Sequence, residues 1–139
     1  MKLAPQIVKT LESSADYFSD SEFKRSKNSV ERSHTAASKL LEKPDSLPII
    51  LELHKKSTLA RKKYRMLTVP NTWRISNIIS YIRKNDKIGE DESVVIIGDK
   101  YIFKNNESIQ TLYNNCAEED GFLYLYYTNV PTFGNCTSK

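Results

Sequence analysis

The sequence predicts a single α+β domain, and three observations support this prediction. The chain has 139 residues, which is enough for one hydrophobic core. Hydrophobic residues make up 39% of the chain and charged residues 27%, a composition too apolar for a wholly disordered protein. Apolar residues follow strand-like patterns in some segments and spacings of three and four in others, so strands and helices are both expected.

The N-terminal part of the chain predicts an arm followed by helices. Residues 1–22 contain several serines and show little apolar pattern, so we expect a flexible N-terminal arm. An N-terminal helical extension is expected over residues 23–46. Within it, Asn28 or Ser29 caps a helix that Pro44 stops.

Two strands are expected to open the body of the domain. Residues 47–53 form a nearly continuous apolar run, which is typical of a central strand covered on both faces. Residues 64–69 alternate in character and contain β-forming residues, which indicates a half-exposed strand. Pro70 ends this second strand.

A long helix and a further series of elements follow. Asn71 or Thr72 can cap a helix over residues 73–84, where four isoleucines recur at helical spacing: Ile75, Ile78, Ile79 and Ile82. Gly98 and Asp99 form a hairpin signal, and the flanking strands are residues 93–97 and 100–103. Ser108 caps a short helix through Tyr113, and residues 122–127 form the last strand.

This order of elements is that of a ubiquitin-like β-grasp fold. We expect a mixed sheet of four to five strands, with the long helix packed across it and two helices before it. The β-grasp domain is expected to cover residues 47–134.

The composition excludes several classes of function. No apolar stretch approaches the roughly 20 residues that a bilayer-spanning helix requires, and the first residues do not form a signal peptide. Two cysteines, Cys116 and Cys136, do not suggest disulfides or zinc spacing, so neither a metal nor another cofactor is expected. We find no set of nucleophile, base and acid and no glycine-rich phosphate loop, which argues against an enzyme.

Positive charge is concentrated in the middle of the chain. Residues 47–104 hold 12 Lys or Arg and 6 Asp or Glu, whereas the whole chain has a net charge of +4. Six of these cations fall within residues 55–65, without an acidic residue among them. Such a cluster attracts acidic partners of any kind, or is simply a solvated loop.

The C-terminal part of the sequence resembles the autophagy-related protein 8 family of ubiquitin-like modifiers, which includes GABARAP and the microtubule-associated light chains. The similarity covers about Phe23 to Gly134 and is strongest near the C-terminus, where it includes residues 118–127 and Thr132-Phe133-Gly134. Shorter matches lie upstream, at Pro44-Asp45, Leu47-Pro48-Ile49-Ile50, Val69-Pro70 and Ile82-Arg83-Lys84.

The resemblance implies a modification pathway. A cysteine protease would cut between Gly134 and Asn135 and remove a propeptide, residues 135–139. Activating and conjugating enzymes would then carry Gly134 to phosphatidylethanolamine. The protein would be cytoplasmic before conjugation and afterwards on the autophagosome membrane, and in the vacuole or lysosome. A glycine fits a narrow enzyme groove, and two acyl chains anchor a protein stably.

The resemblance also implies a docking site for aromatic-x-x-aliphatic peptides of cargo receptors and autophagy factors. Such peptides add a strand to the exposed second strand. The deep aromatic pocket would be lined by Leu40, Pro48, Met66, Thr68 and Phe122. The aliphatic pocket would be lined by Leu67, Val69, Pro70, Trp73, Ile78 and Tyr81.

The rim of the aromatic pocket departs from the family pattern. Met66 and Thr68 replace a lysine and a leucine, and Ala36 replaces an acidic residue. We therefore expect a shifted ligand preference, in which acidic residues beside the motif bind a basic flank formed by Lys62, Lys63 and Arg65.

Two other functions compete with this one. A modifier of the autophagy-related protein 12 type is joined to a protein lysine, and Leu112-Tyr113-Asn114-Asn115 resembles that branch. Phe133 precedes the glycine where that branch has tryptophan, which favours the lipid-conjugated branch. A small basic nucleic-acid-binding domain is suggested weakly by the pI of about 9.0 and the basic run, and no nucleic-acid partner is expected.

Overall fold

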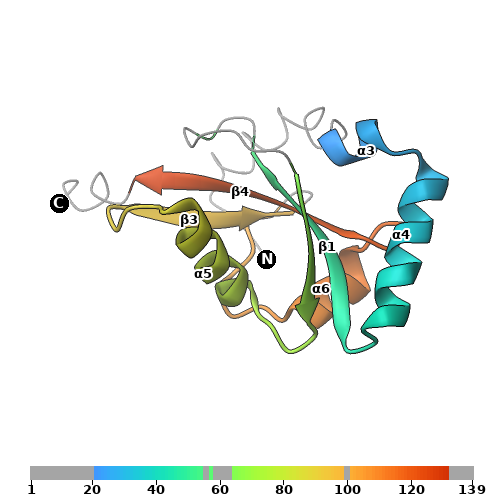
Figure 1. Cartoon of the computed structure of the whole chain (residues 1–139). Coiled ribbons are helices and arrows are strands. Elements are labelled where there is room, and N and C mark those ends of the chain that lie inside the picture. Colours follow the sequence, from blue (N-terminus) through green and yellow to red (C-terminus); the bar gives the residue numbers. More distant parts are fainter. Residues whose placement is uncertain (1–20, 55–56, 58–63, 99–100, 132–139) are drawn as a thin grey trace.

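A computed structural model describes residues 21–54, 57, 64–98 and 101–131 of the chain (Figure 1). Four strands form one sheet in the order β2-β1-β4-β3. The described elements are, in chain order, α3 (Glu22–Ser26), α4 (Ser29–Glu42), β1 (Ser46–Leu53), β2 (Arg65–Pro70), α5 (Ile75–Asp86), β3 (Glu92–Ile97), α6 (Ile109–Cys116) and β4 (Leu123–Pro131). The predicted α+β class and the mixed sheet are confirmed.

The centre of the sheet is made by the first and last strands, β1 and β4. They run parallel, with Ile49 opposite Leu123, and each has an antiparallel neighbour on its other side. Every residue of β1 from Leu47 to Leu53 is buried, as expected for a central strand covered on both faces. Consequently β2 and β3 form the two edges of the sheet.

Helices cover both faces of the sheet, and alternate residues of β1 point into two separate cores. Ile49 packs in a cluster with α5, whereas Ile50 packs in a second cluster with α3 and α4. Figure 1 shows α5 and α4 on opposite sides of the sheet. The period-two pattern of a strand thus gives each face its own apolar contacts.

Helix α5 begins later than the sequence predicted. Asn71 and Thr72 do not cap it, because residues 73–75 first pair with residues 107–109. The Ile75 amide donates to the Glu107 carbonyl, and the Ile109 amide donates to the Trp73 carbonyl. Arg74 is the cap instead, and Trp73 lies outside the helix.

The second hairpin strand predicted over residues 100–103 is reduced to an isolated antiparallel bridge between Ile97 and Ile102. Two backbone hydrogen bonds flank it, from the Gly98 amide to the Tyr101 carbonyl and from the Phe103 amide to the Ile96 carbonyl, and residues 99–100 lie outside the described residues. The Phe103 ring packs in the core on the α5 side. It lies so close to Gly98 that a Cβ atom added at residue 98 would be 2.3 Å from Phe103 Cζ. Anchored in this way, the chain leaves the sheet toward α6.

The N-terminal helices begin before the predicted boundary at residue 23. Ser21 caps α3 and is buried, and Glu22 forms the first turn of this helix, so neither belongs to an arm. Residues 1–20 of the predicted arm lie outside the described residues. The predicted cap of α4 is confirmed, because the Asn28 side chain accepts from the Glu31 amide and the Glu31 side chain accepts from the Asn28 amide.

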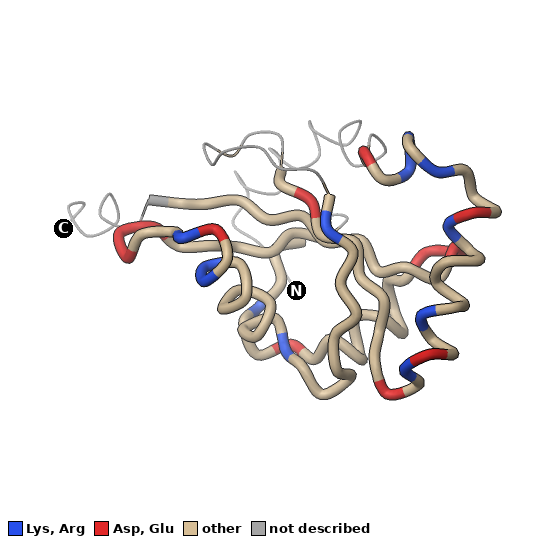
Figure 2. The backbone as a smooth tube through the Cα atoms, in the orientation of Figure 1, with Lys and Arg blue, Asp and Glu red and all other residues tan. Residues whose placement is uncertain are grey.

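Charged residues of both signs are distributed along α3 and α4, whereas the strands contain few of them (Figure 2). Most of the basic cluster predicted over residues 55–65 lies outside the described residues. Within the described part of the chain, no helix is long and apolar enough to cross a membrane. That same part contains no group of three or more potential metal ligands.

Candidate functional site

The candidate site is the outer edge of β2. This strand pairs with β1 through an antiparallel ladder from Ser46–Pro70 to Leu51–Arg65, and no other described strand lies on its far side. An edge strand presents unpaired N–H and C=O groups that can bind an added strand. β2 therefore offers the backbone groups that β-augmentation requires.

Alternation along β2 divides its side chains between the two sides of the sheet. Leu67 and Val69 pack with the core on the α5 side, together with Trp73, Ile78 and Tyr81. Of this group, Leu67, Trp73 and Tyr81 are half-buried, whereas Val69 and Ile78 are buried. Five of the six residues predicted for the aliphatic pocket thus lie in one cluster; the sixth, Pro70, is exposed at the strand end.

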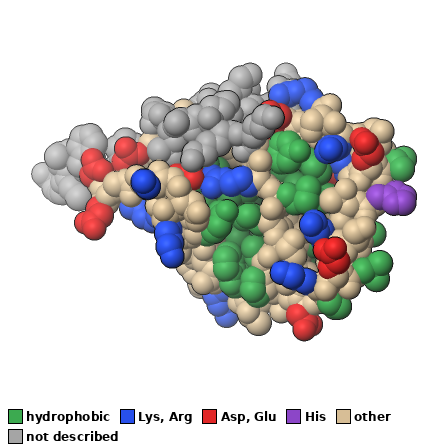
Figure 3. Space-filling view, viewed as in Figure 1, with side chains coloured by type: hydrophobic (Ala, Val, Ile, Leu, Met, Phe, Trp, Pro, Cys, Tyr) green, Lys and Arg blue, Asp and Glu red, His purple; other side chains and the backbone are tan. Residues whose placement is uncertain are grey.

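The other side of β2 faces the helices α3 and α4. Met66 packs on the cluster that contains Phe122, and Thr68 lies opposite the buried Pro48 in the strand register. Leu40, the α4 residue predicted for this pocket, is half-buried. Figure 3 shows hydrophobic side chains in two groups between α5 and α4.

Two aromatic residues near this pocket were not predicted from the sequence. The Phe23 ring of α3 lies 5.2 Å from the Phe122 ring and 4.9 Å from the Tyr64 ring, centroid to centroid, both edge to face. Phe122 itself is fully buried, so it forms the floor beneath Met66 rather than an open wall. The resemblance to the family reached back to Phe23 but assigned this residue no role.

Helix α3 is held in place by polar contacts with β1 and with the loop before β4. The buried Glu52 carboxylate accepts from the Ser21 hydroxyl and from the Glu22 amide. Lys24 forms an ion pair with Glu118, 2.5 Å between Nζ and Oε1. These contacts fix the helix that carries Phe23 and thereby the floor of the pocket.

Arg65 is a correction to the predicted basic flank. Its guanidinium forms a bidentate ion pair with Asp86, with both N–O distances 3.0 Å, and also donates to the Tyr127 hydroxyl. Burial opposes its charge, but the hydrogen bond to Asp86 and the charges around it leave the pKa of Arg65 raised. Arg65 therefore links β2 to the end of α5 and to β4 and does not belong to an open basic flank. Lys62 and Lys63 lie outside the described residues.

A second buried acid, Asp120, connects α4 to the end of the sheet. Its carboxylate accepts from Arg32 Nε at 2.9 Å, from the Tyr124 hydroxyl at 2.5 Å and from the Phe122 amide at 3.0 Å. Burial, and then the hydrogen bond to Asp120, raises the pKa of Tyr124 well above its ordinary range. Ala36 lies in this region too, buried beside Gly121 and not at an open rim.

The predicted processing site cannot be placed on this fold. Gly134 and residues 135–139 lie outside the described residues, which end at residue 131. The described sheet ends with β4, three residues before Gly134.

The fold and the open edge of β2 define a ubiquitin-like domain, and comparison with a solved structure agrees. The crystal structure of Trypanosoma brucei ATG8 superposes with a TM-score of 0.76 at 26% sequence identity, covering 82% of this chain and 98% of that one. The model of the family "Autophagy protein Atg8 ubiquitin like" matches residues 31–134. This chain therefore belongs to the Atg8 family of ubiquitin-like autophagy proteins.

Curated relatives show the same similarity over most of their length. The chain is 30% identical over 108 residues to autophagy-related protein 8e of Arabidopsis thaliana, covering 77% of this chain and 88% of the relative. It is 31% identical over 107 residues to autophagy-related protein 8 of Schizosaccharomyces pombe, covering 76% and 88%. The predicted family and β-grasp fold are confirmed.

Proposed function

We propose that this protein is a lipid-conjugated autophagy modifier that recruits partners through the edge of β2. The observation that carries the docking part is the position of β2, an edge strand with separate apolar groups on its two sides. An added peptide strand would pair with its backbone, the aromatic side chain entering on the α4 side and the aliphatic one on the α5 side. Each buried anchor contributes roughly 1.5–3 kcal/mol.

The conjugation part of the proposal assigns Gly134 as the reactive residue and residues 135–139 as a propeptide. The match to the family model supports it, because that match extends to residue 134. A processing cysteine protease, activating and conjugating enzymes and a phosphatidylethanolamine membrane are the proposed partners. The unconjugated protein would be cytoplasmic, and the conjugate would lie on the autophagosome membrane and later in the vacuole or lysosome.

Peptide titration tests the docking part. Trp73, the single tryptophan, lies in the group on the α5 side and can report binding by its fluorescence. An aromatic-x-x-aliphatic peptide should bind with micromolar affinity, and Leu67→Ser should weaken it at least tenfold. Val95→Ser is the matched control, because Val95 is half-buried on the opposite edge strand, β3. Equal affinity of the Leu67 and Val95 variants would place the peptide elsewhere.

A basic flank would now depend on Lys62 and Lys63, since Arg65 is paired with Asp86. A Lys62→Ala/Lys63→Ala variant should weaken binding of a peptide with acidic residues before its motif, and leave a neutral peptide unaffected. Equal affinity of the variant and the unchanged chain for the acidic peptide would remove the flank from the proposal.

Intact-mass measurement tests the conjugation part. With purified family protease, the chain should lose its last five residues, and Gly134→Ala should not. After conjugation with liposomes that contain phosphatidylethanolamine, a phospholipase should release the modifier from the membrane. A conjugate that resists the phospholipase would instead indicate attachment to a protein lysine.

A further inference from the structure

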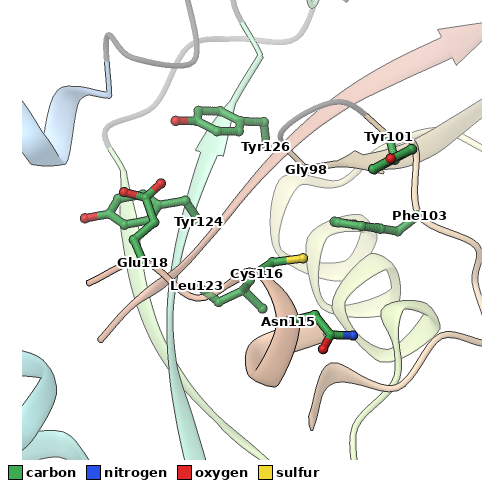
Figure 4. Close-up of a pocket in the computed structure, with 9 residues that line it drawn as sticks. All are labelled: Gly98, Tyr101, Phe103, Asn115, Cys116, Glu118, Leu123, Tyr124 and Tyr126. Carbon is green, nitrogen blue, oxygen red and sulfur yellow. The ribbon is translucent and has the colours of Figure 1, made fainter. Parts of the chain in front are cut away.

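The outer face of α4 carries the two most exposed large apolar side chains in the described part of the chain. Val30 is 65% exposed and Leu41 is 82% exposed. The other two exposed large hydrophobic residues among the described ones lie elsewhere. Tyr101 lines an aromatic cavity of about 400 Å³ together with Phe103 (Figure 4), and Val130 lies near the end of β4. Within the described chain, α4 is thus the element that presents two such residues.

The spacing along α4 places these two residues on one stripe. Residues 30, 34, 37 and 41 follow one another at intervals of four, three and four, so they lie on one face of the helix. All four of them are exposed: Val30, His34, Ala37 and Leu41. Figure 3 shows hydrophobic side chains on both sides of a histidine at this edge of the molecule. We call these four residues the α4 stripe.

The opposite face of α4 holds the helix on the domain. Ala36 is buried beside Gly121, and Arg32 forms the ion pair with Asp120. Figure 1 shows α4 at the outer margin of the molecule, with no described element beyond it. The α4 stripe is therefore not used in the contacts with the sheet, and the described chain does not cover it.

The intervals of four and three residues are those of the a and d positions in a coiled coil. A stripe of this kind packs against the same pattern on a second helix, because each apolar side chain enters a hole between side chains of the partner. From residue 30 to residue 41 the stripe extends about 16 Å, which a partner helix of about two heptads would cover. The pattern therefore indicates a helix as the partner.

The charge beside the α4 stripe indicates that this helix is basic. Glu31 and Glu42 are exposed on one flank of the stripe, whereas the two cations of α4, Arg32 and Lys39, lie on the opposite side of the helix. An antiparallel second copy of α4 would bring the same glutamates to that flank, and an anionic membrane surface would repel them. Lys or Arg residues on a partner helix would instead complement both carboxylates.

We propose that the α4 stripe is a second docking surface, which binds an amphipathic helix of a partner protein. This helix would carry apolar residues at its a and d positions and Lys or Arg residues beside them. None of the four stripe residues belongs to the two predicted docking pockets at β2. The protein would thus hold a partner helix on α4 while a motif peptide occupies the edge of β2.

A designed helical peptide tests the proposal. The probe has about three heptads, with Leu at the a and d positions and Lys beside them, and its counterpart has Glu in place of Lys. In calorimetric titration of the full-length protein, the Lys peptide should bind roughly tenfold more tightly than the Glu peptide or better. Val30→Ser/Leu41→Ser should weaken binding of the Lys peptide by roughly tenfold or more, because the apolar burial is lost.

The matched control is Tyr101→Ser/Val130→Ser, which removes the other two exposed large hydrophobic residues and should leave the affinity unchanged. Glu31→Gln/Glu42→Gln tests the charge separately. Glutamine preserves the cap of α4, so this variant should fold but lose most of the preference for the Lys peptide over the Glu peptide. Circular dichroism establishes folding. The aromatic-x-x-aliphatic peptide should bind all these variants equally, which distinguishes a failure at α4 from a failure at β2.

Three results would overturn the proposal. The first is equal affinity of Val30→Ser/Leu41→Ser and its matched control for the Lys peptide. The second is a dimer of the chain alone, in analytical ultracentrifugation, that Val30→Ser/Leu41→Ser dissociates, because the stripe would then bind a second copy. The third is binding to phosphatidylcholine vesicles that the same variant abolishes, because the stripe would then be a membrane contact.

Discussion

The buried pair of Arg32 and Asp120 should be the polar contact on which the N-terminal helices most depend. The two side chains are 15% and 4% exposed, and Asp120 also accepts from the Tyr124 hydroxyl and the Phe122 amide. Hydrogen bonds to charged groups contribute about 1.5–3 kcal/mol each. Asp120→Asn keeps one acceptor oxygen but removes the charge and places an amide donor near Arg32, so we expect a loss of about 2–4 kcal/mol.

Arg32→Met is the complementary change, because it keeps the apolar stem and removes the guanidinium. Asp120 would then keep two donors, so the cost should be about 2 kcal/mol, below the roughly 3–5 kcal/mol of a fully orphaned buried charge. The guanidinium also donates to the Lys24 and Lys27 carbonyls, which adds to the effect. The double variant should lose less than the sum of the two single losses, with a coupling energy of about 1–3 kcal/mol.

Urea unfolding followed by Trp73 fluorescence measures these free energies, since the chain has one tryptophan. Lys39→Met on the same helix is the matched control and should change the free energy of unfolding by less than about 0.5 kcal/mol. Hydrogen exchange shows whether α3 and α4 open before the sheet does. Additive losses in the double variant, within about 0.5 kcal/mol, would refute direct coupling between Arg32 and Asp120.

Three further predictions concern stability. Burial, and then the hydrogen bond to Asp86, raises the pKa of Tyr127 from 10.0 to about 12. The folded chain therefore holds this proton more tightly than the unfolded chain does, and it loses stability as the pH rises from about 10 to about 12. Tyr127→Phe should flatten that decline in urea unfolding measured at each pH. Gly121 has φ of 92°, and a Cβ there would lie 2.9 Å from the Ala36 Cβ. Gly121→Ala should therefore cost about 1–3 kcal/mol and lower the melting temperature, and an unchanged melting temperature would contradict this packing. Arg65→Met removes the bidentate partner of Asp86 and should destabilise the domain by about 2–4 kcal/mol in the same urea assay, whereas an exposed flank residue would cost almost nothing.

Periodicity in the sequence was sufficient to find the strands and the helices that pack on them. The apolar run of β1 predicted burial on both faces, and the alternation in β2 predicted a half-exposed strand. The start of α5 could not be predicted in the same way, because Trp73 and Ile75 first pair with a segment more than 30 residues away. Local capping signals at Asn71 and Thr72 were overridden by this long-range pairing.

The contacts that secure α3 were equally hidden from the sequence. Ser21 and Glu52 are 31 positions apart, and nothing in either neighbourhood marks them as partners. A residue at the end of a poorly patterned segment looks like part of an arm, but Ser21 is buried because a carboxylate from β1 faces it. Helix termini carry unsatisfied N–H groups, so the position of an acceptor elsewhere in the fold decided where α3 begins.

Local sequence patterns likewise predicted some features of the docking site, whereas others depend on long-range contacts. Which side chains of β2 face α4 and which face α5 follows from alternation, and this period of two is enough to assign Met66 and Leu67 to different sides. The charge at the strand's start does not follow from any local pattern, because the partner of Arg65 is Asp86, 21 positions later at the end of α5. A count of cations in the basic cluster therefore overstates the positive charge that a bound peptide would meet. With Arg65 paired, the proposed preference for acidic flanking residues would rest on Lys62 and Lys63, and measuring peptide affinity at increasing salt would test its electrostatic origin.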